Sequence, residues 1–407
     1  MLTGYRINTF LADGESTEYY LDVESMDADT ETVVKVNGEV LGSADYEVDT
    51  AGGRILFQTP PPAPLTDGQD NVSVKFKKTV PGYRERINGC TILAVFDNRV
   101  FFSGNPDYPN VVWHCSLHDP GYCSDTDYYN EGLDLARVTG LVAGNNALWV
   151  MKEPSQANTT VFYHNPTIDS EYGKIYPSTH SSISTGCVAK AVNFNDDIVF
   201  FSDRGMEAIN GDVTTEQVLA HRSTLIDRKL LLEPDYEEMV LEEWEGYLLV
   251  CVGKHIYLAD SRKMFTNENH MEYEWFYWEL EEKVICTRVQ EGILYLGTEK
   301  GIYSMTGEGA VESFWTTPID RFSNPQYLKT TNKRGCVVEA LGDVKVLVKT
   351  DLEPWEEVGS YPDVKDAFVC RIKKKKFKDI QMKFQSKKRF SLETATLECY
   401  VGGYKKR

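Results

Sequence analysis

Residues 239–250 read MVLEEWEGYLLV, which is an apolar strand, a two-residue turn and a second apolar strand. Four other segments share this plan: TILAVFDNRVFF at 91–102, TGLVAGNNALWV at 139–150, AKAVNFNDDIVF at 189–200 and ICTRVQEGILYL at 285–296. The equivalent turn positions are 98, 146, 196, 246 and 292, so successive copies lie 48, 50, 50 and 46 residues apart. This period predicts a repeat whose unit is a small antiparallel sheet.

A second pair of strands follows the hairpin in the last two repeats. The candidate strands there are GKHIYL at 253–258 with YEWFYWE at 273–279, and KGIYS at 300–304 with VESFW at 311–315. Four strands in a unit of this length are typical of a β-propeller blade. Because one blade cannot bury both of its faces alone, we predict that five blades close a ring, with four or six as the alternatives.

The repeats are flanked by two further β-rich segments. The first contains short alternating strands and the hairpin signal Asn37-Gly38, which predicts a small β-sandwich. The last predicts a second antiparallel β-sandwich, and one helix is expected over 223–233, ahead of Pro234. The fold prediction is therefore all-β, with an N-terminal β-sandwich at 1–82, a central β-propeller at 83–316 and a C-terminal β-sandwich at 317–407.

Charge differs along the chain. Residues 1–80 hold 14 acids and 6 bases (net −8), and residues 318–407 hold 12 acids and 20 bases (net +8), so the middle carries the whole net charge of −19. Such acidity argues against a surface that grips nucleic acid or anionic lipid. The basic run 371–378 is interpreted first as a solvated strand and turn. No apolar stretch is long enough to insert into a membrane, and we expect no secretory signal.

Motifs for nucleotide binding, serine hydrolysis and zinc proteolysis are missing from the sequence. Four possible zinc ligands lie within ten residues, but their spacing does not match a tetrahedral site: His114, Cys115, His118 and Cys123. An acidic segment also lacks the glycine and the final glutamate of a calcium loop: Asp125, Asp127, Asn130 and Glu131. We therefore predict no metal and no cofactor.

Propeller glycosidases place two carboxyl groups beside the glycosidic bond. The candidate carboxylates in the repeats are Asp97, Asp196, Asp203, Glu243 and Glu245. Most of them occupy hairpin turns, where acidic side chains are favoured for local backbone bonding, so a turn role is the preferred interpretation. Four tryptophans would stack on sugars if exposed, although aromatic residues of this kind usually fill the space between blades: Trp113, Trp149, Trp275 and Trp278.

Three groups of short motifs resemble segments of a known family. They are GNPDYPN at 104–110 with VWHCS at 112–116 and DPGY at 119–122, WTTPID at 315–320 with Lys329, and DGEST at 13–17 with YEVD at 46–49. Together they are similar to segments of β-propeller proteins in bacteriophage tails. The resemblance implies a virion structural protein of the tail hub or nozzle type of short-tailed phages.

In that family several copies, often six, form a ring below the portal and adaptor proteins and extend the channel through which DNA leaves. The resemblance thus implies a homo-oligomer in the virion tail, assembled in the host cytoplasm, with no enzymatic activity. An acidic propeller would let genomic DNA pass without specific binding. The chain is compact and lacks the long inserted domains of some nozzles, so a distal tail or neck position is also open.

Assembly contacts are predicted in the loop after the first hairpin and in the C-terminal basic run. The residues are Asn105, Asp107, Tyr108, Trp113, Asp119, Tyr122, Lys373, Lys374, Lys375 and Lys376. We expect the basic C-terminal module of one copy to meet an acidic propeller face of the next. The alternatives are a five-bladed propeller glycoside hydrolase or depolymerase, and a non-catalytic adhesin that binds a host receptor.

Overall fold

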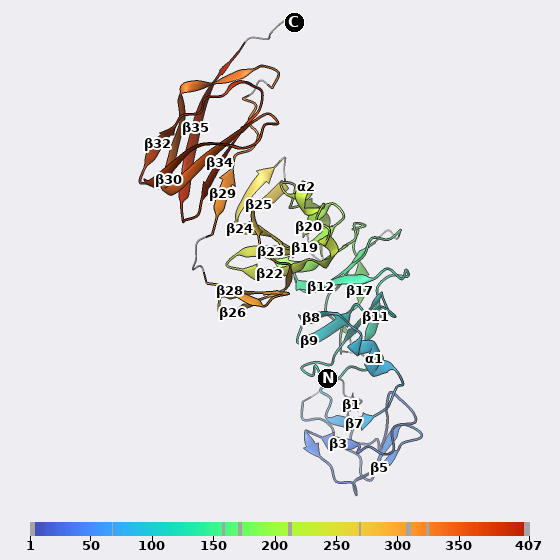
Figure 1. Cartoon of the computed structure of the whole chain (residues 1–407). Helices are drawn as coiled ribbons and strands as arrows, with labels where there is room; N and C mark the ends of the chain where they lie inside the picture. Colours follow the sequence, from blue (N-terminus) through green and yellow to red (C-terminus); the bar gives the residue numbers. More distant parts are fainter. Residues whose placement is uncertain are drawn as a thin grey trace. The chain divides into compact units, whose positions relative to one another are not determined.

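The computed structural model describes residues 5–66, 68–156, 159–169, 173–210, 214–267, 270–306, 311–322 and 325–402 (Figure 1). The chain divides into two compact units, Met1–Met305 and Thr306–Arg407. Both consist of antiparallel strands, with only short helices among the described residues. The all-β prediction is confirmed.

The N-terminal segment forms two sheets around one apolar core. One sheet has the order β1 (Tyr5–Phe10), β7 (Val72–Lys77), β3 (Val33–Val36), β4 (Glu39–Val40), and the other has the order β2 (Glu18–Tyr20), β6 (Arg54–Phe57), β5 (Tyr46–Asp49). Val34, Ile55 and Phe76 are fully buried between them. Asn37 and Gly38 have φ values of 50° and 83° and join β3 to β4, so the predicted hairpin is confirmed.

Helix α1 (Tyr83–Asn88) follows the N-terminal segment and precedes five consecutive sheets, here called the central sheets. The first contains β8 (Ile92–Phe96), β9 (Arg99–Ser103), β10 (Val111–His114) and β11 (Tyr128–Asn130). The second contains β12 (Val138–Gly144), β13 (Ala147–Lys152), β14 (Val161–His164) and β17 (Ser178–His180). A separate hairpin of β15 (Thr167–Asp169) and β16 (Gly173–Ile175) precedes β17.

The other three central sheets continue the same strand order. The third contains β18 (Ala191–Phe194), β19 (Asp197–Ser202), β20 (Gly205–Asn210) and β21 (Val218–His221). Helix α2 (Asp227–Leu230) and the 3-10 turn η1 (Tyr236–Glu238) follow. The fourth contains β22 (Val240–Trp244), β23 (Tyr247–Val252), β24 (His255–Asn267) and β25 (His270–Glu279). The fifth contains only β26 (Val284–Gln290), β27 (Ile293–Thr298) and β28 (Ile302–Met305).

The repeated hairpins have the turn geometry that their sequences predict. Both turn residues have positive φ in all five repeats, at 97–98, 145–146, 195–196, 245–246 and 291–292. Two successive positive φ values define a type I′ turn, whose twist matches that of the paired strands. Asp97, Asp196 and Glu245 occupy these turns, which confirms the turn interpretation for those three carboxylates.

Apolar cores join each central sheet to the next. Phe101 and Leu148 share a core between the first and second sheets, and Trp149 and Phe200 share one between the second and third. Similar cores join the third sheet to the fourth and the fourth to the fifth. The arrangement is propeller-like because meandering sheets pack face to face in sequence order.

The second unit has two sheets that share one long strand, β30 (Lys329–Thr350). In one sheet the order is β29 (Ser313–Thr316), β34 (Ile380–Ser386), β30, β31 (Glu356–Val364). In the other, β30 pairs with β32 (Ala367–Cys370), β33 (Lys375–Phe377) and β35 (Ser391–Val401). Val338, Val346 and Phe384 are fully buried in the core.

Two sequence predictions about particular elements are wrong in detail. The strand expected to complete the fifth repeat, at 311–315, instead lies in the second unit, where Trp315 of β29 pairs with Phe384 of β34. The position of β29 is set by its backbone pairing with β34, a strand distant in the sequence, and local strand propensity does not show which partner a strand will take. The helix expected over 223–233 is α-helical only at 227–230.

Candidate functional site

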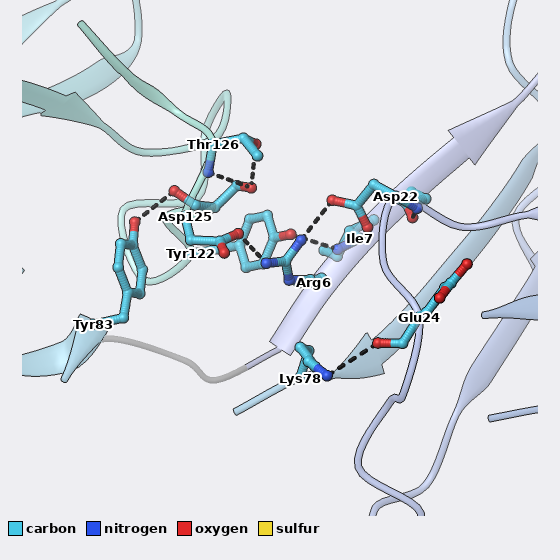
Figure 2. A network of polar contacts seen from close by, with 11 residues as sticks. Arg6, Ile7, Asp22, Glu24, Lys78, Tyr83, Tyr122, Asp125 and Thr126 are labelled. Carbon is cyan, nitrogen blue, oxygen red and sulfur yellow. Dashed lines mark hydrogen bonds and ion pairs between the residues drawn. The ribbon is translucent and has the colours of Figure 1, made fainter. Parts of the chain in front are cut away.

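A buried arginine connects the N-terminal segment to the loop after β10. Arg6 of β1 is 5 % exposed, and its Nη1 atom lies 2.7 Å from Asp22 Oδ2 (Figure 2). Its Nη2 atom forms a second ion pair with Asp125, which belongs to the loop. The guanidinium therefore bridges a carboxylate of the N-terminal segment and a carboxylate of the loop. Removing either carboxylate would leave part of a buried charge uncompensated, which is destabilising.

Two tyrosines add hydrogen bonds to the same junction. The backbone N–H of Ile7 donates to Tyr122 Oη at 2.9 Å, and Tyr83 Oη donates to the carbonyl of Ser124 at 2.5 Å. Burial raises the pKa of the Tyr122 hydroxyl, which therefore stays protonated at neutral pH. The loop is thus fixed on both sides, by the N-terminal segment and by α1.

Three of the six predicted assembly residues between 105 and 122 are buried. Asn105, Trp113 and Tyr122 are 4 %, 3 % and 5 % exposed. Asn105 Nδ2 donates to the carbonyl of Arg86 at 2.6 Å, and the ring of the half-buried Tyr108 meets Trp113 edge-on at 5.8 Å. The three buried side chains therefore shape the loop from the inside and are not available for direct contact with a neighbouring subunit.

The other predicted assembly residues are more accessible. Asp107 is exposed, and Asp119 is half-buried with its Oδ1 accepting the N–H of Gly121 at 3.0 Å. In the basic run the side chains of Lys373, Lys375 and Lys376 are exposed. Lys374 is instead ion-paired within its own unit, at 3.3 Å to Glu353 and 2.5 Å to Glu356. Only three of these four lysines keep their charge available for a partner.

A fully buried polar group lies between the first and second central sheets. Glu131 and His164 are both 0 % exposed, and Glu131 Oε1 lies 2.8 Å from His164 Nε2. Ser178 Oγ donates to the other oxygen of Glu131 at 2.6 Å, and His164 Nδ1 lies 2.8 Å from the carbonyl of Tyr176. Every polar atom of the Glu131 and His164 side chains thus has a partner, which is what such burial requires.

A second histidine and carboxylate lie in the same layer. Burial lowers the pKa of His114, although the nearby Asp127 opposes this, and burial raises the pKa of Asp127. The imidazole of His114 stacks on Tyr129 at 5.6 Å between ring centroids. His114 is 8 % exposed and packs among aromatic rings, so this imidazole is part of the core and is not open to a substrate.

The candidate metal ligands do not converge. Among the described residues, which include 114–131 completely, no group of three His, Cys, Asp or Glu side chains is placed to hold a metal ion. No helix in the described part of the chain is long and apolar enough to cross a membrane.

A serine, an aspartate and a histidine meet at the start of α2. His221 Nε2 lies 2.6 Å from Asp227 Oδ2, and Ser223 Oγ donates to Oδ1 of the same carboxylate. The bond to Asp227, together with Glu207 Oε1 at 3.3 Å from His221 Nδ1, raises the pKa of His221 to about 10. Because serine and histidine both bind the carboxylate, and no hydrogen bond described here joins them, the group lacks the contact that would activate a nucleophile.

A partly exposed cluster of titratable side chains lies after α2. Glu233 Oε1 lies 2.8 Å from His255 Nδ1 and accepts a hydrogen bond from Tyr257 Oη. The Glu233 side chain is 9 % exposed and that of His255 is 20 % exposed. This arrangement combines a carboxylate, an imidazole and a phenol within hydrogen-bond reach.

A lysine and a second carboxylate border this cluster. Lys229 Nζ lies 3.0 Å from the centroid of the Tyr277 ring, and desolvation lowers the pKa of Lys229 while Glu233 and Glu279 raise it. Burial, with help from Glu279 and Glu233, raises the pKa of Tyr277 to about 12. Both carboxylates therefore act on the same two side chains. Sequence reasoning missed them, although each ends a recognisable segment, STLIDRKLLLE and EWFYWE.

The first and fifth central sheets each have an uncovered face. Leu93 and Val95 of β8 are 63 % and 71 % exposed, and they point away from the core shared with the second sheet. On the fifth sheet, Leu294 faces the fourth sheet, while Ile302 is 77 % exposed. No apolar core among the described residues joins these two sheets. The row of sheets therefore ends in apolar surface on both sides.

No family model matches the sequence, and no curated protein matches it. Among solved structures, BamB from Moraxella catarrhalis is similar with a TM-score of 0.33 and 11 % identity over 74 % of this chain and 97 % of that one. An exo-β-1,3-galactanase from Phanerochaete chrysosporium has a TM-score of 0.30 and 10 % identity over 77 % and 95 %. A putative exported protein from Bacteroides fragilis has a TM-score of 0.31 and 12 % identity over 72 % and 84 %.

The expectation that this chain has no enzymatic activity is corrected by these comparisons. The similar structures include the galactanase and a second protein described as a glycoside hydrolase, with a TM-score of 0.23 and 10 % identity over 75 % and 96 %. None of the structures named here is a phage tail protein. The absence of catalysis is therefore not retained as an expectation for this chain.

Proposed function

We propose that this chain is a structural subunit of a bacteriophage tail, of the hub or nozzle type. Its five central sheets would be the blades of an open β-propeller, whose first and fifth sheets share no apolar core among the described residues. This propeller would lie between two β-sandwiches in the chain, and about six copies would form a ring with portal and adaptor proteins as neighbours. Genomic DNA would pass through the ring without specific binding. The resemblance at 104–122 and 315–320 supports this proposal, which places the protein in the virion tail after assembly in the host cytoplasm.

The main structural support for the proposal is the uncovered apolar face on each of the first and fifth central sheets. Fully burying one large aliphatic side chain contributes about 1.5–3 kcal/mol, so leaving Leu93, Val95 and Ile302 in water forgoes a substantial stabilisation. A second copy that covers these faces would recover it. Contacts between different faces of identical subunits generate rings when the rotation closes.

Charge complementarity supports the same arrangement. The C-terminal segment 318–407 carries a net charge of +8, and residues 81–317 carry −19. Lys373, Lys375 and Lys376 are exposed and available to an acidic surface of the next copy. Contacts of this kind guide association and weaken as salt increases.

We expect the purified full-length chain to form a closed oligomer whose stability falls with added salt. Replacing both Leu93 and Val95 with Lys should weaken association by about tenfold or more, because two like charges would enter the contact. Native mass spectrometry and light scattering measure the copy number. Leu65→Lys is the matched control, since Leu65 is 93 % exposed on the N-terminal segment. A wild-type monomer at all concentrations, or a double variant that assembles normally, would contradict the proposal.

A polysaccharide-cleaving activity is the second candidate, and the cluster after α2 favours it. Glycoside hydrolysis needs two carboxyl groups in different environments. Glu233 is mostly buried and bonded to His255 and Tyr257, whereas Glu279 is half exposed and pairs with Lys254 at 2.9 Å. The two side chains thus offer the acid and base roles of this chemistry.

If the second candidate is right, the wild-type chain should release reducing ends from a panel of bacterial surface polysaccharides. Glu233→Gln and Glu279→Gln should each lower that rate by about 10²–10⁴, because a positioned acid or base contributes about this factor. Glu243→Gln, on the exposed part of β22, is the control. No release by the wild type from any polysaccharide in the panel would contradict this activity.

A further inference from the structure

The second unit has an open groove between the terminal strands of its two sheets. Strand β29 is the last strand of one sheet, and β35 is the last strand on the same side of the other. Two cavities of about 430 Å³ and 530 Å³ adjoin there and share Thr317 and Ala395. We call this the Trp315 groove, and its side chains with recognition chemistry are Trp315, Thr317, Asp320, Phe390, Glu393 and Thr394.

Trp315 supplies a fixed aromatic surface at one end of the groove. Its ring stacks on Phe384 at 5.9 Å between centroids and 30° between planes, and Phe384 is fully buried. Even so, Trp315 remains 48 % exposed. An indole that is held in place yet half exposed can bind an apolar ligand face at little entropic cost.

Polar groups lie along the same groove. Glu393 is exposed, and none of the hydrogen bonds or ion pairs described for the chain involves its carboxylate. Thr317, Thr394 and Thr396 add hydroxyl groups, and Asp320 adds a second carboxylate at the far end. These side chains can accept hydrogen bonds from a ligand rich in hydroxyl groups.

The groove lining excludes an anionic ligand. The net charge of 318–407 is +8, yet no Lys, Arg or His is among the residues that line the two cavities. A phosphate or sulfate would meet Glu393 and Asp320 without a compensating cation, which is unfavourable. A neutral molecule with one apolar face and many hydroxyls can pack against Trp315 and donate hydrogen bonds to the two carboxylates.

We propose that the Trp315 groove binds a neutral oligosaccharide. The apolar face of a sugar ring would lie on Trp315, and its hydroxyls would donate to Glu393 and neighbouring threonines. The combined size of the cavities falls within the range of small-ligand sites. This site differs from the sugar platforms considered from the sequence, because Trp113 and Trp149 are buried in unit 1. It is independent of both candidate functions.

The test titrates the full-length chain with cellotriose, maltotriose, laminaritriose and β-1,3-galactotriose, each up to about 10 mM, which detects a Kd of about 1 mM. Tryptophan fluorescence and saturation-transfer NMR are the measurements. At least one sugar should bind, and Trp315→Ala should weaken it by about tenfold or more. Trp355→Ala, at a tryptophan that is 36 % exposed elsewhere in this unit, should leave binding unchanged.

A second variant guards against a folding defect. Thr394→Lys changes an exposed position on β35 and should block the groove without removing the Trp315–Phe384 stack. Failure of all four sugars to bind would overturn the proposal. Undiminished binding by Thr394→Lys, or equal losses for the Trp315 and Trp355 variants, would also overturn it. Tighter binding of dextran sulfate would show that the ligand is not neutral.

Discussion

Replacing Glu131 with Ala should destabilise unit 1 by about 3–5 kcal/mol, which is the usual cost of removing one partner from a buried pair. Glu131 and His164 are completely inaccessible, and the Glu131 carboxylate binds both His164 and Ser178. Without that carboxylate, the imidazole Nε2 atom would lose its partner in a site that water does not reach.

Denaturant unfolding of the full chain, followed by tryptophan fluorescence, measures this loss as a lower midpoint. Ser178→Ala is the matched control, because it removes only one hydrogen bond and should cost about 1 kcal/mol. The double variant Glu131→Ala with His164→Phe should recover part of the stability, since an apolar pair leaves no buried group unsatisfied. A Glu131→Ala midpoint equal to that of the wild type would show that the pair is not buried as described.

Replacing Trp149 with Ala should cost about 3–5 kcal/mol, because it empties the core between the second and third central sheets. Trp149 is 0 % exposed, its ring contacts Tyr163 at 5.3 Å, and its Nε1–H donates to the carbonyl of Gly144 at 3.0 Å. The substitution therefore removes packing and leaves one carbonyl without its donor.

The two contributions can be separated in the same unfolding measurement. Trp149→Phe keeps most of the apolar volume and removes the hydrogen bond, so we expect a smaller loss than for Trp149→Ala. Trp355→Ala, at a partly exposed position, should change stability by less than about 0.5 kcal/mol. A Trp149→Ala variant as stable as the wild type would contradict the packing of these two sheets.

The sequence predicts the geometry of the hairpin turns, but it does not predict which side chains of the loop at 104–122 are buried. The positive φ values at Asn146 and Asp196 follow from residue types that tolerate this conformation, so the turns were predictable. The orientation of Asn105 and Trp113 was not predictable, because their partners in α1 and β9 become neighbours only after the first sheet has folded. Polar and aromatic side chains of a loop can therefore point inward as readily as outward.

The candidate sites could not be predicted from the sequence, because each depends on residues that are distant along the chain. No sequence feature links Glu131 to His164, which is 33 positions away, or Glu233 to Glu279. The Trp315 groove depends on β29 joining the C-terminal sheet, whereas local composition favoured a strand of the fifth repeat. Each of these pairings is set by how whole sheets pack, and several alternative pairings satisfy the same local pattern.

The all-β class, the repeat of about 48 residues and the type I′ hairpins follow from the order of residues along the chain. These features depend on neighbours a few positions apart, whose steric preferences act before any long-range contact forms. Tertiary packing decided which acidic, aromatic and basic side chains are buried, paired or exposed. Whether a side chain is buried or paired depends on contacts with strands that are distant in the sequence. The free energy of those contacts cannot be read from any one segment.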